Sequence, residues 1–364
     1  MEYVERLNYY LGELLKAGGS DLHIKPFSQP WTRVNGALLP LPTDPLSPDS
    51  TAQIARVAMG DAAWERFKVK KEADFAYRQA GLGRFRVNAF IQRGTVSMVF
   101  RSVSIDPPTT ADLGLPDTLN SIADQRRGLV LVTGPTGSGK TSTLAAMVDH
   151  VNATRHDHIV TIEDPIEVLH RDKASIINQR EIGMDTESFA VAMRAAMRQD
   201  PDVILVGEMR DVDTVTAVLQ AAETGHLVFS TLHTIGAAET IVRIVDFFPP
   251  HLQQQIRVAL AGTLRAVICQ RLVRSTDGKS RYPALEIMIN NGRVMQCILD
   301  PAKTYEIGQI VAEGGFYGMR TFDQSLIELF RDGKIALEEA MEQASNAHDL
   351  KLALTNAGLL SHAE

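Results

Sequence analysis

The stretch "LVLVTGPTGSGKTSTL" (residues 129–144) joins an apolar run to a glycine-rich loop and then to residues suited to a helix. Within it, Gly134–Thr141 fits the pattern G-x-x-x-x-G-K-[ST]. Glycines let successive backbone N–H groups wrap a phosphate, and the start of a helix adds its positive dipole. Because strand, loop and helix follow in the right order, we interpret this stretch as a nucleoside triphosphate site.

The motif assigns separate roles within the loop. Lys140 is expected to reach the β- and γ-phosphates of ATP, and the Thr141 hydroxyl is expected to coordinate Mg²⁺. The residues expected to bind the nucleotide are Gly134, Pro135, Thr136, Gly137, Ser138, Gly139, Lys140, Thr141 and Ser142.

Three further apolar runs follow, "HIVTIED" (158–164), "DVILVGE" (202–208) and "HLVFSTLH" (226–233), with helical patterns between them. These runs lack in/out alternation, which is typical of strands buried on both faces of a parallel sheet. An α/β core is therefore expected. After residue 250 the pattern favours helix to the end, with a polar break at 273–291.

Acidic residues end two of these runs. Glu208 ends the run 202–208, where it is placed to hold Mg²⁺ through water or to orient the attacking water. Glu163 and Asp164 end the run 158–164, and Glu167 follows three residues later. The carboxyl ends of parallel strands converge at the ligand, so Glu163 is a candidate catalytic residue, whereas Glu167 also fits a surface loop.

Two histidines frame the last run, His226 before it and His233 after it. A histidine at a strand end is usually a satisfied structural group. A pair beside a γ-phosphate site also fits a sensor of the nucleotide. Both interpretations stay open.

The first 105 residues show a different pattern, with a helix near residues 4–15, short strands around an Asn35-Gly36 turn, a helical stretch at 49–71 and alternating strands beyond it. This predicts a small α+β domain over 1–105. We expect a linker over 106–120, where prolines interrupt any periodicity, and the ATPase domain over 121–364.

The strands of this first domain carry Arg84, Arg86, Arg93 and Arg101. A solvated strand face accounts for at least one of them. The functional alternative is that two of them reach the nucleotide as the domain closes over it, because guanidinium groups neutralise the transferring phosphate.

Composition excludes several classes of protein. A net charge of −7 over 364 residues disfavours a nucleic-acid motor, the main rival of another class, and no acceptor domain of a small-molecule kinase is evident. Two cysteines, Cys269 and Cys297, support neither a disulfide framework nor a zinc site and fit a reducing cytosol. No apolar run is long enough to span a membrane.

Together, "GPTGSGKTSTLAAM" (134–147), "TIEDPIE" (161–167), "DPDVILVGEMRD" (200–211) and "AAETGHLVFSTLHT" (221–234) resemble the four signature boxes of secretion ATPases. The residues of these four motifs are most similar to those of the type IV pilus retraction ATPases, the PilT/PilU-like family. "GGSDLHIKP" (18–26), "RFRVNAFIQRG" (84–94) and "GMRTFDQSL" (318–326) share that resemblance, which covers most of the chain.

The resemblance implies a homohexamer whose subunits combine a PAS-like domain with a RecA-like P-loop core and bind nucleotide between the two. Family positions match Arg86 and Arg101 as phosphate contacts, Glu208 as the catalytic carboxylate assisted by Glu163, and His226 and His233 as the histidine box. It also implies a cytoplasmic motor, peripheral at the inner membrane, that acts on a platform protein of the pilus, with a second retraction ATPase as a possible partner.

Two observations bear on the branch of the family. Assembly and type II secretion ATPases carry a four-cysteine zinc insertion and a longer N-terminal region, and neither is expected here. However, "EIMINNGRVMQCILD" (286–300) replaces an element of the principal retraction motors, and the tail after residue 337 looks more like the accessory branch. Retraction is therefore expected, with the principal and accessory roles both open, and a ring member that binds ATP without hydrolysing it as a further alternative.

Overall fold

The computed structural model describes residues 3–360 and divides into two compact units, Met1–Ile105 and Asp106–Glu364. The expected linker at 106–120 belongs to the second unit, because Leu115 and Leu119 are buried in its hydrophobic core.

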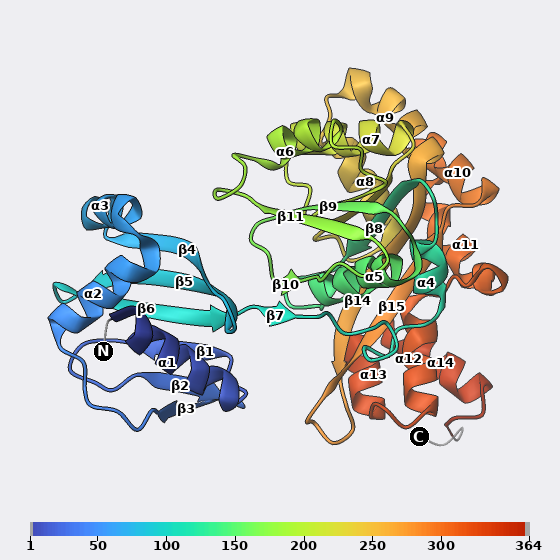
Figure 1. Cartoon of the computed structure of the whole chain (residues 1–364). Coiled ribbons are helices and arrows are strands. Elements are labelled where there is room, and N and C mark those ends of the chain that lie inside the picture. The colour runs from blue at the N-terminus through green and yellow to red at the C-terminus, as the bar shows by residue number, and fades with distance from the viewer. Residues whose placement is uncertain (1–2, 361–364) are drawn as a thin grey trace. The chain divides into compact units, whose positions relative to one another are not determined.

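The first unit is a six-stranded antiparallel sheet with three helices (Figure 1). The strands lie in the order β3-β2-β1-β6-β5-β4. Asn35 and Gly36 form the expected turn, with φ of 49° and 85°, which suits a tight hairpin. The elements are α1 (Tyr3–Lys16), β1 (Asp21–Ile24), β2 (Trp31–Val34), β3 (Ala37–Pro40), α2 (Pro48–Met59), α3 (Asp61–Lys70), β4 (Glu72–Gln79), β5 (Gly83–Gln92), β6 (Thr95–Ser102) and β7 (Ser104–Ile105).

One face of this sheet forms the core of the unit. Leu22, Phe100 and Val87 are paired across β1, β6 and β5, and all are buried with the apolar face of α1. Their neighbours along each strand point to the opposite face, because side chains alternate. Asp21, Arg101 and Arg86 form one such row across the same three strands.

The second unit is built on a seven-stranded sheet in the order β11-β9-β12-β13-β8-β14-β15, parallel except for β15 (Figure 1). Its first half contains α4 (Thr118–Ala123), β8 (Gly128–Thr133), α5 (Lys140–Thr154), β9 (His158–Glu163), β10 (Val168–Leu169), β11 (Ile176–Glu181), α6 (Phe189–Ala196), β12 (Val203–Val206), α7 (Val212–Glu223) and β13 (Leu227–Leu232). Its second half contains α8 (Ala237–Asp246), α9 (Pro250–Thr263), β14 (Leu264–Arg274), β15 (Arg281–Ile289), α10 (Gly292–Leu299), η1 (Pro301–Glu306), α11 (Ile307–Glu313), η2 (Gly314–Tyr317), α12 (Phe322–Arg331), α13 (Leu337–Gln343) and α14 (Ala347–Asn356).

Strand β8 shows why the apolar runs read as buried strands. Leu129 and Leu131 pack into the core formed with α6, α7, α8 and α9, whereas Val130 and Val132 pack into the core formed with α4 and α5. All four side chains are fully buried. The sheet is covered on both faces, so the expected parallel α/β core is confirmed.

The expectation of helix in the C-terminal part is wrong for Leu264–Arg274, which is mostly outside the expected polar break and forms β14. The expected polar break at 273–291 contains a second strand, β15 (Arg281–Ile289), after a turn. β14 pairs with β8 on one side and β15 on the other, and this pairing overrides the local pattern. Within residues 3–360, no helix has both the length and the apolar character needed to cross a bilayer.

Candidate nucleotide site

The glycine-rich loop joins β8 to α5 as the motif predicts. Gly134, Gly137 and Gly139 have φ of 139°, 81° and 89°, a region that favours glycine, and α5 begins at Lys140. The Lys140 ammonium donates hydrogen bonds to the carbonyl oxygens of Gly134 and Pro135, at 2.8 and 3.0 Å. The lysine is thus folded over the loop at the start of the helix, where the helix dipole favours an anion.

A cavity of about 630 Å³ opens beside this loop. It gathers side chains from the carboxyl ends of several strands, as expected for a ligand site in a parallel sheet. Its lining includes Thr136, Gly137, Gly139, Lys140, Thr141, Ser142, Glu163, Asp164, Glu167, His170, Phe189, Glu208, Arg210, His233 and Arg281. The structure therefore brings together the loop, both candidate carboxylates and His233.

Glu163 is the more enclosed of the two carboxylates. Its Oε1 accepts a hydrogen bond from Thr161 Oγ1 at 2.6 Å and another from Gln179 Nε2 at 3.1 Å. Burial raises the pKa of the Glu163 carboxyl, and the two hydrogen bonds oppose that rise. Glu163 is thus held rigidly, in a setting that makes its ionised form harder to reach.

Glu208 lies at the end of β12 with its carboxylate in contact with other charged groups. It forms an ion pair with Arg210, and its Oε2 lies 3.6 Å from His233 Nε2. Burial lowers the pKa of the Lys140 ammonium, and the negative charge of Glu208 acts in the opposite direction. Glu208 is therefore electrostatically coupled to Lys140.

The structure does not bring His226 to this cavity, which corrects the expectation that two histidines frame one site. His226 precedes β13, and its Nδ1 lies 3.0 Å from the carbonyl oxygen of Ala221 near the end of α7. His233 follows β13 at the other end. Six residues at about 3.3 Å each separate the two by roughly 20 Å, so only His233 reaches the nucleotide side of the sheet.

Arg86 and Arg101 lie in the first unit, on adjacent strands and directly opposite each other. Arg101 Nε donates to Oδ1 of the buried Asp21 at 2.8 Å. Burial works to raise the pKa of Asp21, but the hydrogen bonds from Ser20 and Arg101 outweigh it and the pKa is lowered. Asp21 thus holds the Arg101 guanidinium, whose side chain is 64% exposed, in a fixed position on the sheet. Contact of either arginine with nucleotide stays a prediction.

Several residues that shape the site had no signal in the sequence. Gln179 and Gln270 reach it from β11 and β14 through hydrogen bonds, and Arg281 reaches the cavity from the start of β15. Arg210 belongs to the quoted acidic box, yet its pairing with Glu208 was not anticipated. Glutamines within strands carry no motif, so only the fold reveals these two.

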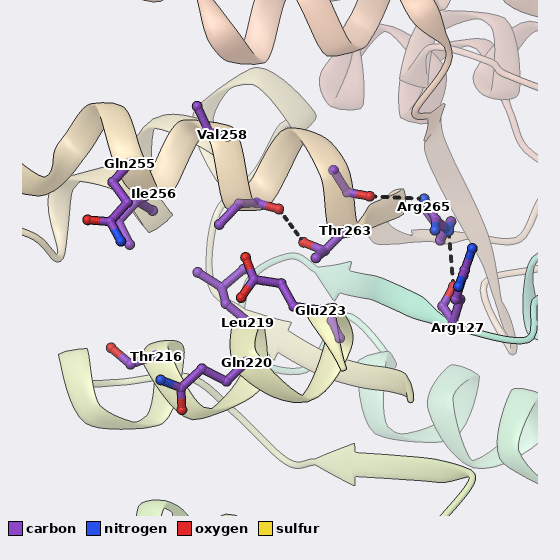
Figure 2. Close-up of a pocket in the computed structure, with 13 residues that line it drawn as sticks. Arg127, Thr216, Leu219, Gln220, Glu223, Gln255, Ile256, Val258, Thr263 and Arg265 are labelled. Carbon is purple, nitrogen blue, oxygen red and sulfur yellow. Dashed lines mark hydrogen bonds between the residues drawn. The ribbon is translucent and has the colours of Figure 1, made fainter. Parts of the chain in front are cut away.

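A second cavity, of about 520 Å³, lies between α7 and α9 at the amino ends of the strands (Figure 2). Leu219, Ile256 and Val258 line it, and Arg265 closes one end by donating to the carbonyl oxygen of Arg127 at 3.0 Å (Figure 2). No glycine-rich loop or acidic strand end reaches this cavity. The nucleotide motif thus does not point to this second cavity.

Within residues 3–360, we find no group of three or more His, Cys, Asp or Glu side chains that could hold a metal ion. This is compatible with Mg²⁺, which usually takes one or two protein oxygens and is otherwise held by phosphates and water. The Thr141 hydroxyl and the Glu208 carboxylate, both lining the cavity, are oxygen donors of that kind.

Comparisons with known proteins identify the family of the chain. Residues 2–298 match the family model described as "Type II/IV secretion system protein". The chain is 44% identical to the type IV pilus retraction ATPase PilT of Pseudomonas aeruginosa over 90% of this chain and 95% of that protein, and 39% identical to the type IV pilus ATPase PilU of the same species over 93% and 88%. The crystal structure of the pilus retraction motor PilT with bound ADP matches 94% of this chain and 98% of its own, at 42% identity and a TM-score of 0.86. The chain belongs to the family of type II/IV secretion system proteins.

Proposed function

We propose that this chain is an ATPase whose hydrolysis of ATP powers retraction of a type IV pilus. The observation that carries the proposal is the cavity where Lys140, Glu163, Glu208 and His233 meet. Similarity to known proteins also supports the proposal. The chain is 44% identical over 90% of its length to a retraction ATPase, and it shares the fold of a retraction motor whose crystal structure contains ADP.

In the proposed reaction, backbone N–H groups of the loop hold the phosphates of ATP, and Lys140 leaves the carbonyl oxygens it now contacts to bind them. Thr141 and Glu208 are the residues that would hold Mg²⁺, which would supply charge neutralisation at the phosphates. Glu208 orients the attacking water, and Glu163 assists from its buried position. His233 reads the state of the phosphate from beside Glu208.

Arg86 and Arg101 complete the proposed site from the first unit, where Asp21 already holds Arg101 in place. Their guanidinium groups would neutralise charge that develops on the transferring phosphate. We further propose that the chain works as a homohexamer at the cytoplasmic face of the inner membrane, and that it transmits force to the platform protein of the pilus.

An accessory retraction ATPase is the second candidate. It is favoured by 39% identity to PilU over 93% of the chain and by the sequence 286–300, which departs from the principal retraction motors. The assembly role is less well supported, because the zinc insertion expected of that branch is missing from the sequence between residues 1 and 364.

The test has two arms. Purified protein should release phosphate from ATP in the presence of Mg²⁺, and the Lys140→Ala variant should not. Deletion of the gene should leave the cell with excess surface pili and without twitching motility, which an assembly motor would not do because its loss removes pili. A deletion strain that loses only part of its retraction force, with pilus number unchanged, would identify the accessory role. Wild-type protein without ATPase activity would refute the proposal.

A further inference from the structure

Gln270 is a buried polar residue in the middle of a strand, directly after the apolar run 266–269. It lies on β14, the neighbour of β8, and is only 3% exposed. Its Nε2 donates to the carbonyl oxygen of Ser138 at 2.7 Å, and its Oε1 accepts from Thr143 Oγ1 at 2.7 Å. One side-chain amide therefore ties the glycine-rich loop to the first turn of α5.

The bond to Ser138 fixes the orientation of a peptide group that matters for anion binding. In a trans peptide the C=O and the N–H of the next residue point in opposite directions. With the Ser138 carbonyl directed at Gln270, the N–H of Gly139 is directed away from Gln270. This N–H lies directly before Lys140, at the start of α5, where backbone donors bind phosphate.

The main chain and side chain of Gln270 also contact the loop at both ends. A Cβ placed on Gly134 would lie 2.3 Å from the carbonyl oxygen of Gln270, and one on Gly139 would lie 2.7 Å from its Nε2. The overlap at Gly134 is with the main chain of β14, so a glycine is required there, whereas the overlap at Gly139 would displace the Gln270 amide from its hydrogen bonds.

We propose that Gln270 is a positioning residue of the nucleotide site: it holds the Ser138–Gly139 peptide so that the loop is already shaped for phosphate before the nucleotide arrives. This rests on the proposed function only in that the loop binds ATP. Its expected effect is on nucleotide affinity, because preorganisation reduces what must be ordered on binding.

The Gln270→Glu variant tests the proposal through its pH dependence. The side chain keeps its size, but an ionised carboxylate cannot donate to the Ser138 carbonyl and repels it. Burial raises the pKa of such a carboxyl, so it protonates as the pH falls and then donates again. We expect the Kd of the full chain for Mg-ADP to be about 10-fold weaker than that of wild type at pH 8.0, because a buried acceptor loses its donor. At pH 5.5 the difference should shrink to within about threefold.

A control variant separates this effect from a general response to replacing a hydrogen-bonded glutamine by glutamate. Gln253, half-buried on α9, also donates to a carbonyl oxygen, that of Phe248 at 3.2 Å, and lies outside the nucleotide cavity. The Gln253→Glu variant should bind Mg-ADP as wild type does at both pH values.

The other partner of Gln270 gives a second, independent pair of variants. Thr143→Val keeps the volume of the side chain but removes the donor to Oε1, whereas Thr143→Ser keeps the hydroxyl. Thr143→Val should weaken Mg-ADP binding severalfold, and Thr143→Ser should bind within about twofold of wild type. This pair decides the matter if Gln270→Glu does not fold.

The outcomes differ between the proposal and its premise. Wild-type protein that binds no Mg-ADP refutes the nucleotide site itself. Wild-type protein that binds, together with Gln270→Glu or Thr143→Val variants of unchanged affinity, overturns the role of Gln270 alone. A loss of affinity in Gln270→Glu that stays constant from pH 8.0 to 5.5 also overturns it, since a merely damaged fold has no reason to recover as the carboxyl protonates.

Discussion

Substitution of alanine for two glycines of the same loop should have very different effects on stability. At Gly134 the backbone has φ of 139°, and an added Cβ would lie 2.3 Å from the Gln270 carbonyl oxygen. At Gly137 φ is 81°, and an added Cβ would have no atom within 4 Å. Gly134→Ala therefore combines backbone strain with a steric overlap against a central strand, whereas Gly137→Ala meets strain alone.

The magnitudes follow from these two terms. A left-handed conformation costs a non-glycine residue about 1–2 kcal/mol, which is all that Gly137→Ala should lose. At Gly134 a glycine-only conformation costs about 1–3 kcal/mol. Overpacking against β14 adds about 1–3 kcal/mol, for a total near 4 kcal/mol. For a unit of this size the melting temperature should fall by roughly 10 °C in Gly134→Ala and by about 3 °C in Gly137→Ala.

Differential scanning calorimetry of the full chain, without nucleotide, measures both shifts and does not depend on any assumed function. The transition of the second unit is the one to follow, because a chain of two units need not unfold in one step. Equal shifts for the two variants, or a Gly134→Ala variant within 2 °C of wild type, would refute the reasoning from close approach.

Three further predictions concern catalysis. Lys140→Ala should abolish ATP hydrolysis while leaving the melting temperature nearly unchanged, because the lysine bonds to two carbonyl oxygens of the loop and, within residues 3–360, makes no ion pair in the core, as measured by phosphate release and calorimetry. Asp21→Ala and Arg101→Ala should each lower kcat, and the double variant should be no worse than Arg101→Ala, because Asp21 acts by holding that guanidinium. Thr161→Val removes a hydrogen bond that lowers the pKa of Glu163, so the acid limb of the kcat–pH profile should move to higher pH.

The parallel core could be predicted from sequence because a strand buried on both faces appears as a continuous run of apolar residues. A strand such as β8 must be apolar at every position, and Leu129 to Val132 are. β14 escaped prediction for the opposite reason. It follows α9 without a break and contains Gln270, and its pairing with β15 and with β8, more than a hundred residues away along the chain, makes it a strand.

The same distinction applies to the site. The loop and the acidic strand ends are local patterns whose spacing reflects their chemistry, and the structure brings Lys140, Glu163 and Glu208 to one cavity. Residues that position them come from elsewhere: Gln270 is 132 residues from Ser138, and Asp21 is 80 residues from Arg101. His226 and His233 are close in sequence, but β13 separates them, so they lie at opposite ends of that strand and only His233 lines the cavity.

The surroundings of Glu163 and Glu208 favour different catalytic roles for the two carboxylates, which the sequence alone could not assign. Glu163 is buried, its pKa is raised, and its Oε1 accepts bonds from Thr161 and Gln179, which an amide oxygen can also accept. Glu208 contacts His233 and is coupled to Lys140, so its charge acts where phosphate binds.

Glu208→Gln should therefore lower kcat by about 100-fold or more, as loss of a residue that orients or activates water does, and Glu163→Gln by about 10-fold. Steady-state phosphate release under saturating Mg-ATP measures both, with Mg-ADP affinity as the control for an intact site. If Glu163→Gln proved the more damaging, the buried carboxylate would be the one that handles the attacking water. Glu208 would then serve chiefly to hold the metal and its ion pair with Arg210.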